Sequence, residues 1–132
     1  MKRLCLFLVI FAVGLFAVAS AQPTQGNVDK KAEKAKLVKA EKAYKIAKAK
    51  LEKTSPKSTK YDEAKKRAVD ATNNFADVTM INGSLSPHEK YAGALHLYRE
   101  VLKLDPKNAH AAENKKMIED VYKSMHRPIP PG

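Results

Sequence analysis

Histidine side chains are the groups in this sequence best suited to catalysis or metal binding, and there are four of them: His88, His96, His110 and His126. A neutral imidazole can act as a general base or bind a transition metal. His96 and Glu100 are spaced to lie one helical turn apart, as are His110 and Glu113. A metal site needs three or four converging ligands, and no paired metalloprotease or di-iron motif is present. We therefore expect these pairs to face solvent and expect no metal ion.

Other catalytic signatures are missing from the sequence. The single cysteine, Cys5, lies in an N-terminal apolar segment that we expect to be removed, which excludes thiol chemistry and cysteine zinc sites from the mature chain. The sequence also contains no glycine-rich phosphate loop and no G-x-S-x-G motif. It therefore predicts a protein that is not an enzyme and has no cofactor.

Residues 1–21 have the organisation of a secretory signal peptide. Two basic residues precede an apolar run at residues 4–19, and Ala19 and Ala21 supply the small residues that a signal peptidase reads. We predict cleavage between Ala21 and Gln22, which would place the mature protein in the periplasm or outside the cell. The apolar run is shorter than the roughly 20 residues of a membrane-spanning helix. Retention as an uncleaved anchor is the alternative.

The remaining sequence predicts a single all-α domain at residues 29–125. Glycine is scarce and tryptophan is absent, and apolar residues recur at helical spacing. After a flexible leader at 22–28, we expect four helices and no strands, the helices at about 29–53, 59–81, 87–105 and 109–125. Ser86, Pro87 and Glu89 form a capping box at the start of the third helix. A proline-rich tail, residues 126–132, follows the fourth.

Each expected helix carries an apolar stripe that should face the core. The stripes are Leu37, Ala40, Tyr44, Ala47 and Leu51; Tyr61, Ala64, Ala68, Ala71, Phe75 and Val78; Tyr91, Ala94, Leu95, Tyr98, Val101 and Leu102; and Ile118, Val121, Tyr122 and Met125. We expect Val38 and Ile46 to be used in packing as well. Between the second and third helices, Asn82-Gly83-Ser84 matches an N-glycosylation acceptor, and we interpret it as a plain turn in an exposed loop.

A pattern of small and aromatic residues ends in proline in two places. It occurs at Ala94, Tyr98, Val101 and Pro106, and again at Ala40, Tyr44, Ala47 and Pro56. With Tyr91, the stretch from 91 to 109 resembles the second helix of a tetratricopeptide repeat, although the preceding helix lacks the signature residues of that family. The resemblance implies helical hairpins stacked as a short array, with a protein or peptide bound on the concave face. A four-helix bundle is the alternative.

Lysine dominates the first helix and indicates a second possible function. The formal net charge is +11, and the excess of basic residues lies in the N-terminal half. We expect an exported, non-enzymatic scaffold that binds a protein partner. The alternative is an electrostatic binder of anionic envelope polymers or a membrane surface. Base-stacking residues are too few to favour nucleic acid. The candidate polyanion-binding residues are Lys34, Lys39, Lys42, Lys45, Lys48 and Lys50.

Overall fold

The computed structural model describes residues 29–131, so the expected signal peptide and the leader lie outside the described residues. This part of the chain forms four helices and no strand: α1 at Lys30–Lys53, α2 at Tyr61–Ile81, α3 at Pro87–Leu104 and α4 at Ala109–Ser124. The predicted all-α class is confirmed. Within the described residues, no helix is both long enough and apolar enough to cross a membrane.

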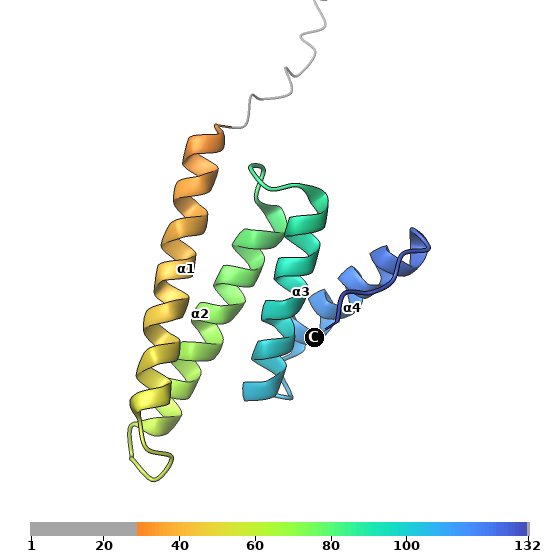
Figure 1. The fold of residues 1–132 in the computed structure, drawn as a ribbon. Coiled ribbons are helices and arrows are strands. Elements are labelled where there is room, and N and C mark those ends of the chain that lie inside the picture. The colour runs from red at the N-terminus through yellow and green to blue at the C-terminus, as the bar shows by residue number, and fades with distance from the viewer. Residues whose placement is uncertain (1–28, 132) are drawn as a thin grey trace, which may run out of the picture.

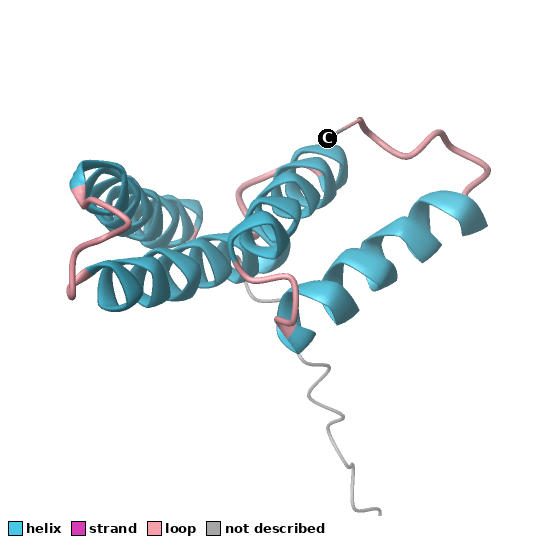
Figure 2. Cartoon of the chain, turned by 90° about the horizontal axis from the view of Figure 1, so that it is seen from below, coloured by secondary structure: helices cyan, strands magenta, loops and turns pink. Residues whose placement is uncertain are grey.

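The helices lie in chain order as an open row. The main packing contacts join α1 to α2, α2 to α3, and α3 to α4. Figure 1 shows α1, α2 and α3 side by side, with α4 crossing α3 at the far end. The second view agrees, because α1 and α4 again lie at opposite ends of the row (Figure 2). The two end helices therefore each have an outward surface that no other helix covers.

The ends of the helices follow their capping residues. The Asp29 side chain accepts hydrogen bonds at the start of α1, and the capping box expected before α3 is present. The second helix begins two residues later than expected because the Ser58 hydroxyl accepts from the Lys60 amide, which stabilises a turn in place of a helical start. The fourth helix ends one residue earlier than expected, at Ser124.

The second helix is buried on two sides because it lies between α1 and α3. The Phe75 ring packs against Tyr44 of α1, with ring centroids 5.4 Å apart. On the side facing α3, Thr79 comes so close to Gly93 that a Cβ atom there would lie 3.2 Å from the threonine methyl. Thr72 and Thr79 are buried, and each hydroxyl donates to the carbonyl four residues earlier. The sequence did not predict this second buried face because a single apolar stripe describes packing on one side of a helix only.

Several predicted core residues are fully buried, namely Ala94, Leu95, Tyr98, Val101 and Ile118. Three assignments to packing are wrong. Val38 and Ile46 are 54% and 60% exposed on α1, and Met125 is 46% exposed just after α4. These residues belong to the two ends of an open row, where each helix has a neighbour on one side only.

The expectation of an exposed Asn82 is also wrong. Its side chain is completely buried, although Gly83 beside it is exposed. The amide group donates to the Glu33 carbonyl oxygen at 2.9 Å, and the side-chain oxygen accepts from the Ser84 amide and hydroxyl. Asn82 therefore attaches the α2–α3 loop to the first turn of α1, and a glycan on this nitrogen would not fit the folded chain.

Candidate interaction surfaces

The residues that carry the tetratricopeptide resemblance lie where α3 packs between its neighbours. Ala94, Tyr98 and Val101 are fully buried, and Tyr91 is half-buried against the same core. Pro106 lies in the exposed α3–α4 loop. The three buried side chains hold α3 in the row and are not available to a ligand.

A polar network built on Asp77 joins three helices. The Tyr98 hydroxyl of α3 donates to Asp77 Oδ1 of α2 at 2.5 Å, and His110 Nε2 of α4 lies 2.8 Å from the same oxygen. Burial, followed by the hydrogen bond to Asp77, raises the pKa of Tyr98 far above its ordinary value. The Tyr98 and His110 rings meet edge to face. We assign this network to positioning α4 on the row.

A second network links α1 to α3. The Tyr44 hydroxyl donates to Glu100 Oε2 at 2.9 Å, and Lys48 Nζ lies 2.5 Å from Glu100 Oε1. Burial acts to raise the pKa of Glu100, but the hydrogen bonds from Lys48 and Tyr44 outweigh it, so the pKa lies below its ordinary value. The pKa of Lys48 is raised by its hydrogen bonds to Glu100 and Tyr44. Both charges are therefore kept at neutral pH.

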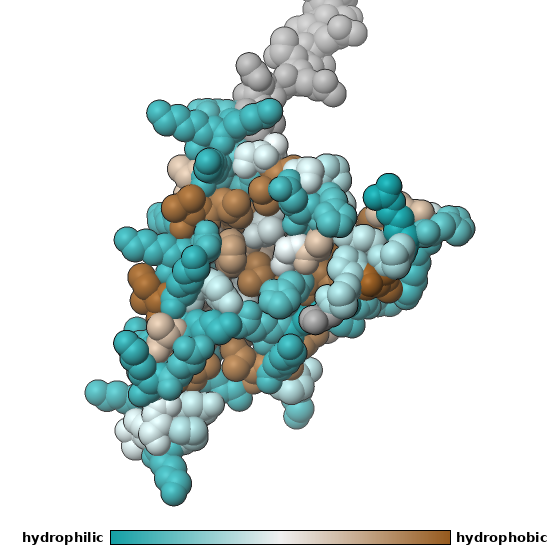
Figure 3. Space-filling model, viewed as in Figure 1, coloured by the Kyte–Doolittle hydropathy of each residue, from teal (hydrophilic) through white to brown (hydrophobic). Residues whose placement is uncertain are grey.

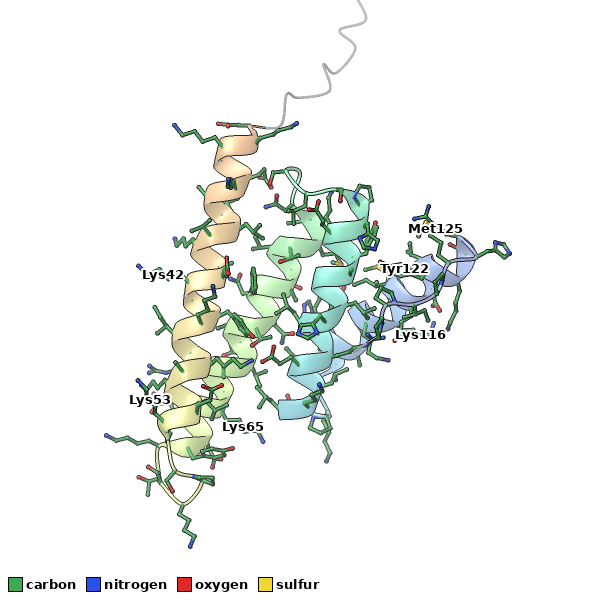
Figure 4. All side chains as sticks on the ribbon, in the orientation of Figure 1. Lys42, Lys53, Lys65, Lys116, Tyr122 and Met125 are labelled. Carbon is green, nitrogen blue, oxygen red and sulfur yellow. The ribbon has the colours of Figure 1, made fainter. Side chains whose placement is uncertain are left out.

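The structure changes the set of candidate polyanion-binding lysines. Lys48 is used in the link to Glu100, and Lys45 pairs with Glu41 one turn away. Within the described residues, the other four are exposed and form no salt bridge: Lys34, Lys39, Lys42 and Lys50. Lys42 and Lys53 project from α1 away from the other helices (Figure 4).

The outward arc of α1 contains no acidic residue. At 100° per residue, Glu33, Glu41 and Glu52 fall toward the packed side or its edges. The opposite side carries lysine and alanine together with Val38 and Ile46, and apolar side chains lie among hydrophilic ones along this edge of the molecule (Figure 3). This surface is therefore cationic, and Val38 and Ile46 are its two exposed large apolar side chains.

The tail returns to the row instead of leaving it. His126 has a φ of 54°, and the Arg127 and His126 amides donate to the carbonyls of Tyr122 and Lys123, which is a Schellman ending of α4. Residues 126–131 then run back from the end of α4 toward the rest of the row (Figure 2). Ile129 packs against the core. The sequence predicted the tail but not its position.

The outer face of α4 is the second open surface. Met117 and Met125 are each 46% exposed, and Val121 between them is half-buried. A shallow hollow of about 480 Å³ lies along this face. Its lining combines the apolar residues with charged ones: Glu113, Lys116, Met117, Asp120, Val121 and Ser124.

Neither expected histidine pair forms in the structure. His110 contacts Asp77 and not Glu113, and Glu100 bonds with Lys48 and Tyr44 while His96 is exposed. Over residues 29–131, no three His, Asp or Glu side chains converge in a way that could hold a metal ion. Comparison with family models, with curated proteins and with solved structures finds no match to this chain.

Proposed function

We propose that the protein is an exported, non-enzymatic interaction module that holds a partner protein at the α3–α4 end of its helical row. The observation that supports this most directly is the outer face of α4, where Met117 and Met125 are left exposed at a point where a further helix could pack. Large flexible apolar side chains surrounded by charged ones are typical of protein-binding surfaces. The tetratricopeptide resemblance of α3 favours the same class of function.

Affinity capture with matched variants tests this proposal. The mature protein is compared with a variant carrying Met117→Glu and Met125→Glu, and with the control Ile81→Glu. Ile81 is 72% exposed at the end of α2, so its substitution adds a charge at an exposed apolar site away from α4. We expect one partner from the source cells to be retained by the wild type and the control and lost by the α4 variant. Equal retention by all three proteins would contradict the proposal.

The outward arc of α1 supports a second candidate function. Its lysines have no acidic neighbour on that arc, and Val38 and Ile46 are exposed among them. Such a surface attracts anionic polymers or lipid head groups. In this alternative, the protein binds the anionic surface of the envelope through α1.

Charge removal with a matched control distinguishes this alternative. We expect replacement of Lys39, Lys42 and Lys50 by glutamine to weaken binding to vesicles that contain anionic lipid, and to reduce the salt dependence of that binding. A control in which Lys57, Lys66 and Lys107 become glutamine removes the same charge from exposed positions outside α1. Equal loss in both variants, or binding that survives high salt, would rule out the α1 surface.

A further inference from the structure

The groove between α3 and α4 already contains an extended proline-rich segment, the tail itself. Residues 127–131 run along α3 after the turn at His126. Arg99 Nη1 of α3 donates to the Pro130 carbonyl oxygen at 2.8 Å. The half-buried Ile129 occupies the apolar part of the groove. The groove therefore offers an extended chain one apolar subsite, at the position of Ile129, and one directed hydrogen-bond donor, Arg99.

The donor also has contacts that do not involve the tail. The Arg99 side chain is largely buried, and its Nη2 lies 3.5 Å from Glu119 Oε1 of α4. Lys115 lies 3.1 Å from the same oxygen. Because a guanidinium anchored in this way loses little freedom when it binds a carbonyl, Arg99 is suited to recognise backbone. Proline segments suit this donor because they are pre-extended and cannot form their own helical hydrogen bonds.

The tail fills the groove only in part. A hollow of about 590 Å³ remains between the tail, the start of α3 and the end of α4. Arg127, Pro128 and Pro131 are exposed. Beyond the turn that ends α4, the half-buried Ile129 and Pro130 and one hydrogen bond from Arg99 hold the segment. We expect a segment with so few contacts to leave the groove without unfolding the helices. The residues around the hollow are His88, Ala92, Tyr122, Arg127, Pro128, Ile129, Pro130 and Pro131.

From these contacts we propose that the α3–α4 groove is a binding site for an extended partner segment in which an aliphatic residue precedes proline. The tail of this chain occupies the site in cis and is displaced by the partner. The partner's aliphatic side chain occupies the position of Ile129, and the carbonyl oxygen of the partner's proline accepts a hydrogen bond from Arg99. This inference rests on the proposed function, because it specifies the chemistry of the partner that the α3–α4 end holds.

A synthetic peptide with the sequence of residues 126–132 serves as the test ligand. Its binding is measured on the full mature chain and on the same chain with Ile129→Asp, which releases the tail. The tail competes at a high effective concentration in the wild type, so we expect at least tenfold tighter peptide binding to the variant. Ile129→Ser is a milder second variant with the same expected direction. A circular dichroism spectrum unchanged from that of the wild type confirms that each variant is folded.

Matched arginine variants test the recognition itself. The arginine substitutions are made in the opened chain, which is the Ile129→Asp variant. Adding Arg99→Ala should weaken peptide binding at least tenfold, whereas adding Arg67→Ala, at an exposed arginine of α2, should leave peptide binding unchanged. No binding to either opened chain, or equal loss from both arginine variants, would overturn the proposal. A stable wild-type dimer with exchanged tails would overturn the assignment to a separate partner.

The groove and the proposed function can fail separately. If the partner is captured through Met117 and Met125 but the peptide does not bind the opened chain, the groove assignment alone is wrong. If the peptide binds as expected but the α4 variant still captures the partner, the proposed role of the α4 face alone is wrong.

Discussion

Two buried tyrosines, Tyr98 and Tyr122, offer a matched test of how the polar networks stabilise the row. Tyr98 donates to Asp77 at 2.5 Å, whereas the Tyr122 hydroxyl has no hydrogen-bond partner within the described part of the chain. Both side chains are almost completely buried. Replacing either residue by phenylalanine removes one oxygen atom and leaves the ring, so the difference between the two variants reports on the hydrogen bond.

The two substitutions should change the free energy of unfolding differently. A hydrogen bond to a charged group contributes about 1.5–3 kcal/mol. Asp77 is 41% exposed and can be hydrated again when Tyr98 is replaced, so we expect the lower end of that range. Tyr98→Phe should therefore lower the free energy of unfolding by about 1.5 kcal/mol, which corresponds to roughly 6–12 °C in Tm for a domain of this size. Tyr122→Phe removes an unpaired buried hydroxyl, so it should leave stability unchanged or raise it by up to about 1 kcal/mol.

Urea and thermal unfolding followed by far-ultraviolet circular dichroism measure both values. An unchanged dependence of the unfolding free energy on urea concentration would show that both variants expose the same surface area as the wild type on unfolding. If the two substitutions destabilise the protein equally, the Tyr98–Asp77 hydrogen bond between α3 and α2 contributes no stability of its own, and the reasoning is refuted.

Three further substitutions test other contacts. The pKa of Glu100 is lower in the folded protein than its ordinary value. The ionised carboxylate therefore stabilises the fold above the ordinary carboxyl pKa, and this stabilisation is lost as the pH falls through the folded pKa. Unfolding measured from about pH 5 down to about pH 3 should therefore show a shallower loss of stability in Glu100→Gln than in the wild type. Asn82→Ala should cost about 1–3 kcal/mol in urea unfolding, since it breaks the tie to Glu33; a loss below the measurement error would show that the tie is not stabilising. His126→Gly should raise Tm, because it relieves a left-handed backbone conformation at a cost of about 1 kcal/mol; an unchanged or lower Tm would argue against strain at this turn.

The helices were predictable because each one carries its own signals. The apolar spacing in the third helix, the capping box at Ser86 and the proline at 106 are local features, and the structure places α3 accordingly. Tyr98 and Val101 are buried as their spacing predicts.

The open ends of the row were not predictable from these local features. Periodicity says which residues can face a neighbour but not how many neighbours a helix has, so Val38, Ile46 and Met125 were assigned to packing. The role of Lys48 depends on Glu100, which lies 52 residues away in the sequence. A lysine in a run of lysines shows no local sign of such a partner.

The return of the tail depends on one backbone conformation. The sequence predicted a proline-rich tail after the fourth helix but gave no direction for it. Its direction is set by the left-handed conformation of His126, a position where glycine is the usual residue. The sequence therefore could not predict the α3–α4 groove that we propose for the partner segment.

Site-specific photo-cross-linking in intact producing cells tests the central claim, that the α3–α4 end holds a partner protein. A photoreactive side chain is placed at Met117 and, as a control, at Ile81, and the products are identified by mass spectrometry. We predict one predominant protein cross-linked from position 117 and absent from position 81. The same products from both positions, or no protein adduct from position 117, would contradict the account.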